Sequence, residues 1–405
     1  MLYRVEIENF YSIRDRQDVD LRVAANAPGE EGLFAPVYPG AKDRVPKALV
    51  IFGSNGSGKS TVLRAIAFLG WFVQESFLRL SPDSPQPCEH FHSKEAEDVP
   101  TRLAMHFSAP LDLSVTNLEN LRHCRYVYEV VLKSVGGRPK TVISESLKYW
   151  PNERGKSLRV FERTEDGTVS GGKTFALGGY RSVINKVRPN ASLISMLAQF
   201  DHVPSLHLRR IAGTIFTNIF IENHDFNEDA VVNFYARNPT VLEALNRDIE
   251  KIDLGIRTVR IEKGPTGPIA QFEHNGLSST LPIQLESHGT RQIIKIFPLM
   301  AQALNTGGVA VVDELDLAVH PLVLPEIIRW FHDPHRNKLN AQLWMSCQNA
   351  SLLEVLQKEE VLFCEKDSAG RTSVYGLQSI QDVRRSDNYY KKYLGGVYGA
   401  VPQLG

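Results

Sequence analysis

The sequence predicts an α/β fold built on a mixed, mostly parallel β-sheet. An apolar run at residues 48–52 is followed by a glycine-rich loop and then by apolar residues at helical spacing. A second apolar run, residues 309–312, ends in two carboxylates. Strands and helices alternate around both runs, which is typical of a parallel sheet whose functional residues lie at the carboxyl ends of its strands.

The glycine-rich loop fits the pattern G-x-x-x-x-G-K-[ST] at Gly53, Gly58, Lys59 and Ser60. Glycines let the backbone fold tightly and point its N–H groups at phosphate oxygens, and the following helix N-terminus adds partial positive charge. Lys59 can reach the outer phosphates, and Ser60 can offer its hydroxyl to Mg²⁺. The alternative is an ordinary glycine-rich turn, but the order strand, loop and helix favours a phosphate loop. The residues expected to bind the nucleotide here are Gly53, Ser54, Asn55, Gly56, Ser57, Gly58, Lys59, Ser60 and Thr61.

The second apolar strand ends at Asp313 and Glu314, which is a Walker B pattern. In such a pair the first carboxylate serves Mg²⁺, and the second orients or deprotonates the attacking water. The pattern is weak alone and gains weight from the phosphate loop upstream. We therefore expect Lys59 and Glu314 to be catalytic, Ser60 and Asp313 to hold the metal, and ATP with Mg²⁺ to be the ligands.

Composition is that of an ordinary globular protein. The 405 residues include 46 Lys or Arg and 46 Asp or Glu, so no basic surface dominates, although a local basic groove fits within a neutral total. The four cysteines (Cys88, Cys124, Cys347 and Cys364) show neither paired nor metal-ligand spacing and indicate reduced thiols. The N-terminus lacks the apolar core of a signal peptide, and no apolar run approaches membrane-spanning length. A cytoplasmic location without membrane contact is expected.

Three regions are expected along the chain. Residues 1–102 and 285–405 should form the nucleotide-binding head, residues 103–180 an antiparallel β insertion, and residues 181–284 a helical lid with short returning strands. In detail, residues 2–10 and 19–23 should pair as strands, and residues 26–46 should form a loop. Helices are expected at 206–223 and 240–252, and the helix that follows residues 286–292 should be kinked at Pro298.

A zinc site is a further possibility at Cys88, His90 and His92. The sequence offers no fourth ligand at a sensible spacing. A polar loop is therefore the preferred interpretation of residues 81–100.

Several stretches together resemble a known family. They are Ile7-Glu-Asn9-Phe10, the phosphate loop, Ser287-His-Gly289, Val311-Val-Asp-Glu-Leu-Asp316, and the C-terminal stretches 383–387 and 393–402. These resemble the ABC-type ATPases of the SMC/RecF class, and most of all the AAA ATPases of bacterial abortive-infection and anti-phage systems, similar to the ATPase half of OLD proteins. The resemblance implies an ABC-type ATPase head, two of which enclose two nucleotides. It also implies that Ser287 and Gly289 contact the γ-phosphate held by the partner head, although a simple helix N-cap by Ser287 or Thr290 is compatible with the same residues.

The sequence departs from this family at two places. Gln348 stands where the family has a histidine after the strand that follows Walker B, and we expect it to orient water and to give slow hydrolysis. The alternative is that Gln348 only caps the next helix, where Asn349 is the better cap. No glutamine is clearly placed to sense Mg²⁺; Gln74 and Gln86 are candidates, each readily explained as an ordinary surface residue.

The resemblance implies an ATP-driven switch that controls a separately encoded effector, such as a nuclease or toxin, until a phage-derived trigger is sensed. The residues after Glu314 are needed for the remaining strands of the sheet, so no Toprim nuclease domain is expected. The alternative function is a DNA-binding repair or chromosome-maintenance ATPase, which the neutral charge counts against. A transporter subunit fits less well because the insertion is long and Leu-Ser-Gly-Gly-Gln is missing.

Overall fold

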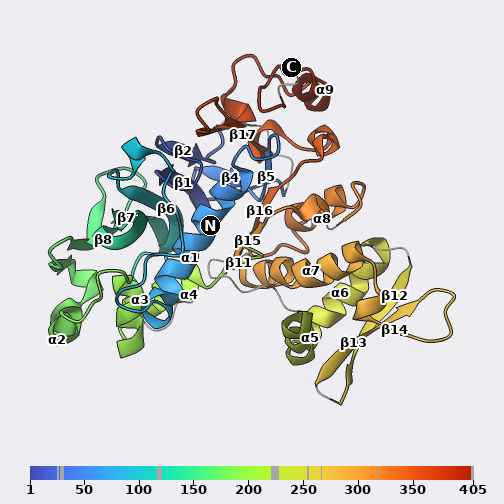
Figure 1. Ribbon diagram of the computed structural model, residues 1–405, viewed down its shortest axis with the longest axis horizontal. Coiled ribbons are helices and arrows are strands. Elements are labelled where there is room, and N and C mark those ends of the chain that lie inside the picture. Colours follow the sequence, from blue (N-terminus) through green and yellow to red (C-terminus); the bar gives the residue numbers. More distant parts are fainter. Residues whose placement is uncertain are drawn as a thin grey trace.

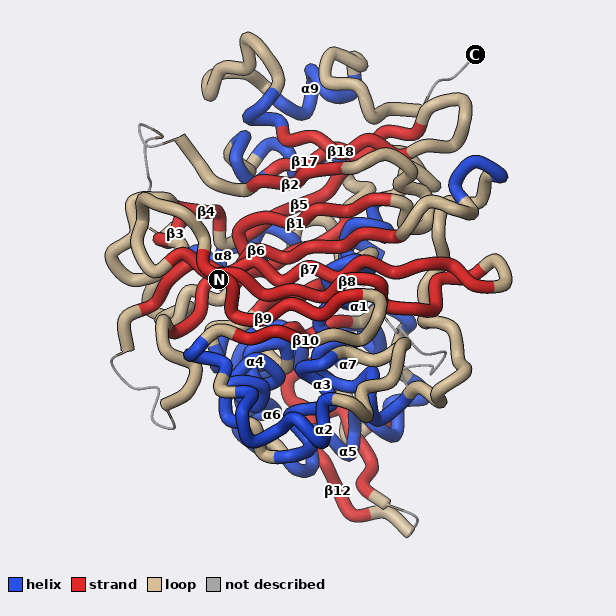
Figure 2. Tube along the Cα trace, turned by 90° about the vertical axis from the view of Figure 1, so that its left-hand side faces the viewer, coloured by secondary structure: helices blue, strands red, loops and turns tan. Residues whose placement is uncertain are grey.

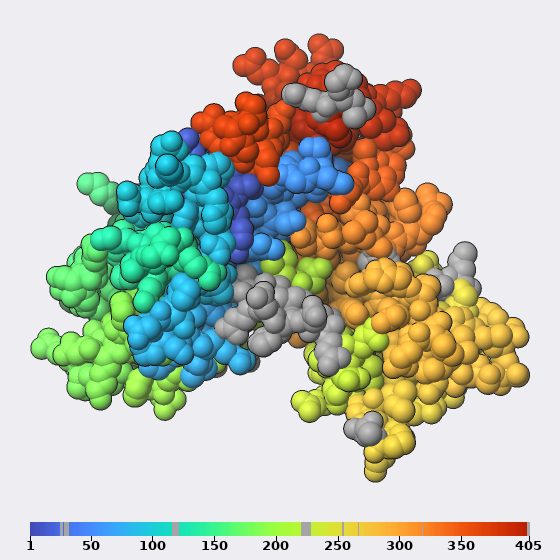
Figure 3. Space-filling model, viewed as in Figure 1, coloured from blue at the N-terminus to red at the C-terminus, as the bar shows by residue number. Residues whose placement is uncertain are grey.

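The computed structural model describes residues 1–405 except 25–26, 28–31, 116–120, 220–227, 253–254, 266, 318 and 403–405. Two sheets organise it, one mostly parallel and one antiparallel, with the long helix α1 (Lys59–Arg79) between them (Figure 1). The predicted α/β class with a mixed sheet and an antiparallel subdomain is confirmed. Figure 3 shows the surface from the same side: the molecule divides into two lobes in its lower half, one mainly from residues 100–210 and one mainly from residues 230–300.

The central sheet has the strand order β11-β15-β16-β5-β17-β18. All neighbouring strands run parallel except the last pair, β17 and β18. Carboxyl ends of the parallel strands therefore meet at one edge, as the sequence predicts. The strands are β5 (Ala48–Phe52), β11 (Ile215–Thr217), β15 (Val309–Val312), β16 (Gln342–Ser346), β17 (Val361–Lys366) and β18 (Thr372–Gly376).

Both faces of this sheet are buried, which explains the continuous apolar runs in the sequence. Successive side chains point to opposite faces, so Leu49 and Ile51 join one hydrophobic core while Val50 and Phe52 join the other. The first core lies between the sheet and α1. The second lies under α7 (His288–Thr306), α8 (Leu324–His332) and α9 (Tyr389–Leu394).

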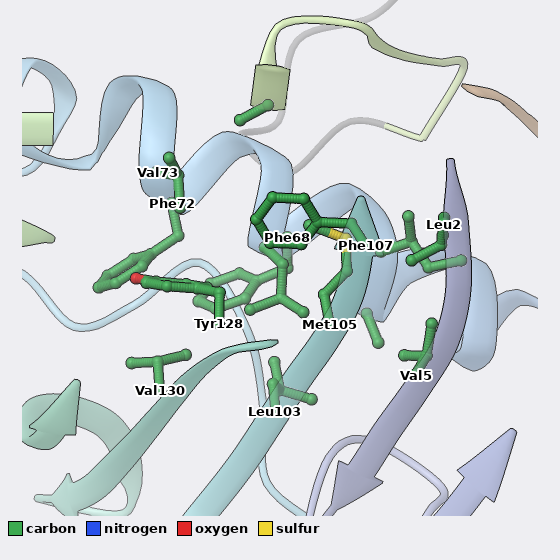
Figure 4. Packing of buried hydrophobic residues seen from close by; sticks show 14 of the residues in the cluster. Leu2, Val5, Phe68, Phe72, Val73, Leu103, Met105, Phe107, Tyr128 and Val130 are labelled. Carbon is green, nitrogen blue, oxygen red and sulfur yellow. The ribbon is translucent and has the colours of Figure 1, made fainter. Parts of the chain in front are cut away.

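The antiparallel sheet has the order β10-β9-β8-β7-β6-β1-β2 (Figure 2). Its strands are β1 (Leu2–Glu8), β2 (Gln17–Asp20), β6 (Thr101–Pro110), β7 (His123–Val135), β8 (Arg138–Trp150), β9 (Leu158–Thr164) and β10 (Val169–Gly171). The expected pairing of the first two strands is present, although the second strand is Gln17–Asp20 and not residues 19–23. Both strands belong to this sheet, and the expected boundary at residue 102 falls inside β6. The reason is shared packing: Val5 of β1, Leu103 of β6 and Phe68 of α1 lie in one core (Figure 4).

The loop expected at residues 26–46 contains a small two-stranded sheet. Its strands are β3 (Phe34–Pro36) and β4 (Arg44–Pro46), which pair antiparallel. Buried Ala35 and Val45 lie at the centre of this pairing. The many glycines and prolines of the stretch hide these three-residue strands from a periodicity argument.

Residues 181–284 do not form one helical lid. Helices α3 (Leu193–Leu197) and α4 (Val203–Ala212) pack on α1 in the first core, and α2 (Arg181–Ile184) packs on α3. The chain then enters the central sheet as β11, so the helix predicted at 206–223 ends at Ala212; residues 220–223 lie outside the described part. Helix α4 ends before Gly213 and Thr214. Strand β11 then pairs with β15 and becomes the edge strand of the central sheet.

The rest of that region joins the second core as a separate lobe. Helices α5 (Glu228–Arg237) and α6 (Pro239–Ile252) pack with the strands β12 (Ile256–Lys263), β13 (Pro268–His274) and β14 (Leu281–Pro282). The predicted helix and strands are thus present at residues 240–274. Figure 1 shows this lobe lying against α7, on the side of the molecule away from the antiparallel sheet.

The sequence predicts a kink at Pro298. In the structure α7 continues through this residue. Proline has no N–H, so the carbonyl of Ile294, four residues earlier, loses its usual donor. The hydroxyl of Tyr235 on α5 donates a 2.9 Å hydrogen bond to that carbonyl instead. Tyr235 is fully buried, and burial raises the pKa of its phenol well above the ordinary value. The hydrogen bond between Tyr235 and Ile294 thus joins the lobe of α5, α6 and β12–β14 to α7.

Helix α1 is long and apolar enough to cross a membrane by length and composition. The structure gives the reason for its composition, because residues such as Phe68, Phe72 and Val73 are packed between the two sheets (Figure 4). It is the core helix of the head.

Candidate functional site

The loop between β5 and α1 takes a conformation that requires glycine at two positions. Gly53 has φ +153°, and a Cβ there would lie 2.3 Å from the carbonyl oxygen of Cys364. Gly58 has φ +103°, and a Cβ would lie 2.3 Å from Oγ1 of Thr372. No side chain of the described residues caps the N-terminus of α1, and the N–H of Thr61 donates to the carbonyl of Gly58, so the N–H groups of Lys59 and Ser60 are the ones available to an anion.

Lys59 lies inside the curve of this loop. Its Nζ donates hydrogen bonds to the carbonyl oxygens of Gly53 at 2.8 Å and Ser54 at 3.1 Å. The side chain is largely buried, and desolvation lowers the pKa of its amine, while Cys364 and the nearby carboxylates of Asp316, Asp313 and Glu314 oppose that shift. The amine is thus held at the loop by two carbonyls that a phosphate ligand can replace as acceptors.

Neighbouring segments hold the loop from outside. Oγ1 of Thr372 on β18 donates to the carbonyl oxygen of Ser57 at 2.8 Å and lies 2.9 Å from Oγ of Ser12. Oγ of Ser12 lies 3.0 Å from Oγ1 of Thr61. The N–H of Ser54 donates to the carbonyl of Ala400 at 3.1 Å, so the C-terminal segment also contacts the loop. The loop is pre-organised by parts of the chain that are distant in sequence.

The two carboxylate residues after β15 are linked by a serine of the next strand. Oγ of Ser346, at the end of β16, donates to Oδ1 of Asp313 at 2.5 Å and accepts from the N–H of Glu314 at 2.7 Å. Glu314 has φ +53°, a left-handed conformation that costs a non-glycine residue about 1 kcal/mol or more. Its carboxylate is exposed and has no hydrogen-bond partner among the described residues. That leaves the carboxylate free for a ligand or water.

Asn218 holds the backbone of Asp313 from the opposite side. Its Nδ2 donates to the carbonyl of Asp313, and its Oδ1 accepts from the N–H of Asp313, both at 2.9 Å. Asn218 follows the end of β11, where it continues the β11–β15 pairing with its side chain. No pattern in the sequence points to Asn218, because periodicity predicts a helix in this region.

Gln348 follows β16 on the same edge of the sheet. Its backbone N–H donates to Oδ2 of Asp316 at 2.7 Å, and its side chain is exposed toward the site. The following turn is capped by Asn349, whose Oδ1 accepts from the N–H of Ser351. The capping role considered for Gln348 is therefore filled by its neighbour.

These groups surround a cavity of about 670 Å³. One wall comes from the phosphate loop and α1, and the other from the carboxyl ends of β15 and β16. The lining residues that matter for the argument are Asn55, Lys59, Ser60, Glu314, Ser346 and Gln348. Asp313 is not part of this lining and lies behind Ser346. A cavity of this volume suits a nucleotide. The open N–H groups and the buried amine fit its phosphates, and the oxygens of Ser60 and Asp313 are the hard ligands that Mg²⁺ prefers.

Ser287 and Gly289 lie outside this cavity. Ser287 is the N-cap of α7, and its Oγ accepts from the N–H of Thr290 at 3.1 Å. Ser287 is nevertheless exposed at the surface. Within one copy of the chain the structure does not bring these residues to the phosphate loop, so their expected contact with a nucleotide requires a second copy.

Three other candidates have structural roles. Nε2 of Gln74 donates to the carbonyls of Gly70 and Ala212, and Nε2 of Gln86 donates to those of Lys140 and Asn190, so neither glutamine lies at the cavity. Both ring nitrogens of His90 face carbonyl oxygens, those of Phe91 and Gly137. His90 is therefore engaged in holding its loop, which agrees with a polar loop here.

The fold and the cavity have the features of a phosphate-loop ATPase. Residues 183–348 match the family model described as "AAA domain, putative AbiEii toxin, Type IV TA system". This range includes Asn218, both carboxylates and Gln348. The predicted resemblance to ABC-type AAA ATPases of bacterial abortive-infection systems is confirmed.

Individual relatives are more distant. The chain is 21% identical over 359 residues to the retron Vc95 probable ATPase of Vibrio cholerae serotype O1 biovar El Tor, with 77% of this chain and 68% of that protein covered. Among solved structures it is similar to an SmcHead bound to the C-winged helix domain of ScpA, with a TM-score of 0.46, 13% identity, and coverage of 93% of this chain and 97% of that one. It is also similar to the SMC head domain from Thermotoga maritima, with a TM-score of 0.39, 15% identity, and coverage of 93% and 98%.

Proposed function

We propose that this chain binds and hydrolyses ATP slowly in the cytoplasm, closes head to head with a second copy, and thereby controls a separately encoded effector in anti-phage defence. The observation that carries the proposal is the cavity in which the Lys59 amine, the uncapped start of α1 and the exposed Glu314 carboxylate face one space. Each group has the charge that one part of ATP hydrolysis needs.

The chemistry follows from these positions. Lys59 and the loop N–H groups bind the phosphates and stabilise the charge that develops on them. Glu314 accepts the proton of a water whose oxygen attacks the γ-phosphorus, and the bond to the bridging oxygen breaks to release ADP. Gln348 can hold that water by a hydrogen bond but brings no positive charge, which fits slow turnover. Mg²⁺ held by Ser60 and Asp313 would neutralise phosphate charge when bound.

Closure with a second copy is supported by apolar side chains around Ser287 and the Walker B stretch. Leu285, Leu317 and Leu322 are 68%, 60% and 82% exposed. Exposed leucines are common singly, but Leu285 lies beside Ser287, which the family resemblance places against the partner's nucleotide, and Leu317 and Leu322 follow the Walker B pair of the nucleotide site. The occupant that this surface fits is therefore another copy of the chain.

Control of an effector is supported only by the family match and by one relative of the chain. The matching family model is described as a putative AbiEii toxin of a type IV TA system, and one relative is named a retron ATPase. The partner in this proposal is the product of a neighbouring gene, a nuclease or toxin, and a phage-derived molecule is the trigger.

Phosphate release from ATP tests the enzymatic part. The wild-type protein should release phosphate slowly, and Glu314→Gln should release it at least about 100-fold more slowly while still binding ATP. Equal rates in the two proteins would remove Glu314 as the base. An absence of ATP binding by the wild type would overturn the function itself.

A further inference from the structure

A second large cavity lies at the end of the central sheet opposite the nucleotide site. It has a volume of about 880 Å³. It is bounded by α6, by the C-terminal half of α7 and by the segment 335–339 between α8 and β16. Figure 1 shows α6 and α7 side by side in this part of the molecule. The segment lies before the start of β16, whereas Ser346 is the last residue of β16 and Gln348 follows it, so the length of a strand, about 15 Å, separates the two sites.

The charge of this groove differs from that of the chain as a whole. Its lining contains Arg247, Lys251, Arg336, Lys338 and His335, against one acid, Asp248. The whole chain has equal numbers of acidic and basic residues. The groove is therefore a local excess of positive charge in a neutral protein.

Asp248, the one acid in the described lining, is paired with an arginine. Arg336 donates to both oxygens of Asp248, with NH1 to Oδ1 at 3.0 Å and NH2 to Oδ2 at 2.6 Å. The guanidinium also lies over the ring of Trp330, 4.0 Å from its centroid. This arginine is fixed, and it ties α6 to the opposite wall.

The other cations remain free. Arg247 and Lys251 stand four residues apart on α6, so they occupy one face, about 6 Å from each other. Lys338 lies across the groove in the segment 335–339. All three side chains are exposed, and none has an ion-pair partner among the described residues. Three cations on two walls thus face a space whose described lining holds no acid other than the paired Asp248.

We propose that this groove binds the phosphate backbone of a nucleic acid. The floor offers little to an amphipathic protein segment, because Phe297, Ala301 and Leu304 are only 1%, 7% and 8% exposed, and only Leu339 presents an open apolar surface. No exposed aromatic ring lines the groove within the described residues, so base stacking is not provided. Spaced cations that can contact phosphates but cannot read bases bind nucleic acid without sequence preference.

The experiment measures binding of a short fluorescein-labelled single strand and of the matching duplex by anisotropy as a function of salt. If three cations each neutralise one phosphate, the slope of log K against log salt is about −2.7 for duplex and about −2.1 for single strand. For the duplex this is a loss of about 40-fold between about 50 and about 200 mM salt.

The test variant replaces Arg247, Lys251 and Lys338 by Gln, and the control replaces Lys148, Lys156 and Lys186. The control lysines are exposed, lie away from the groove and lack ion-pair partners in the described chain, so both variants lose the same charge. We expect the groove variant to lose at least 10-fold in affinity and most of the salt slope, and the control to keep both. ATP binding should be unchanged in both variants, and Lys59→Ala should still bind the oligonucleotide, so this proposal can fail independently of the proposed function.

Three results would overturn it: no binding of either oligonucleotide by the wild type at low salt, equal binding by the groove and control variants, or tighter binding of a polyglutamate peptide than of the oligonucleotides. The last result would assign the groove to an acidic protein segment instead.

Discussion

The hydroxyl of Ser346 donates a 2.5 Å hydrogen bond to Oδ1 of Asp313. The same oxygen accepts the N–H of Glu314, so one buried serine on β16 fixes both residues that follow β15. This link joins the strand of the Walker B motif to the strand that leads to Gln348. It sets the geometry on which the proposed hydrolysis depends.

Ser346→Ala should therefore weaken the metal site. The carboxylate of Asp313 would lose its positioning donor, and loss of such an outer contact typically reduces metal affinity by about 10- to 100-fold. A Mg²⁺ titration of ATP turnover measures this shift. Ser346→Thr keeps the hydroxyl and should stay closer to the wild type. Identical Mg²⁺ dependence in Ser346→Ala and the wild type would show that the link is only structural.

Lys59→Ala should reduce ATP affinity by about 3 kcal/mol, roughly 100-fold, because charged hydrogen bonds to phosphate are lost. Isothermal titration with ATP measures the affinity, and circular dichroism checks that the fold is retained. Lys148→Ala serves as the control, since Lys148 is exposed and outside the cavity. ATP binding at wild-type affinity by the Lys59 variant would refute the assignment of the loop.

Gln348 is the residue that should set the turnover rate. Gln348→His should raise turnover because an imidazolium can stabilise the transferring group, and Gln348→Ala should lower it while sparing ATP binding. Single-turnover phosphate release separates this effect from product release. If both variants turn over at the wild-type rate, Gln348 takes no part in the chemistry.

Much of this site could be predicted because its parts are contiguous in the chain. The loop at residues 53–61 and the pair Asp313–Glu314 carry their own local patterns. Asn218, Ser346 and Thr372 could not be found this way, since each reaches the site only through the pairing of strands that are distant in sequence.

The fold was predictable to a similar extent. Long strands and helices followed from periodicity. The three-residue strand β11 did not, because a segment so short between helices has no measurable period, and its place beside β15 is decided by tertiary pairing. Because β11 places residues 215–217 in the central sheet, residues 181–284 do not form the single lid that the sequence predicts.

The Tyr235–Ile294 hydrogen bond should contribute to stability. Tyr235→Phe leaves the Ile294 carbonyl buried without a donor, which should cost about 1–3 kcal/mol in the free energy of unfolding. Pro298→Ala restores a backbone N–H that can bond to that carbonyl, so the Tyr235 substitution should cost much less in the Pro298→Ala background. Urea unfolding of the four proteins in this cycle gives the coupling energy. Equal costs in both backgrounds would mean that the hydroxyl does not replace the missing N–H.

The molecular mass of the Glu314→Gln variant with and without ATP tests the central claim most directly. The carboxamide keeps the shape of the site but cannot accept the proton, so bound ATP should trap two heads closed on each other. Light scattering coupled to size exclusion should show twice the monomer mass with ATP and Mg²⁺, and a monomer without nucleotide. Adding Ser287→Arg, which places a bulky charge at the exposed start of α7, should abolish the ATP-dependent dimer. A mass that does not change with ATP, and that is the same with and without Ser287→Arg, would contradict the account.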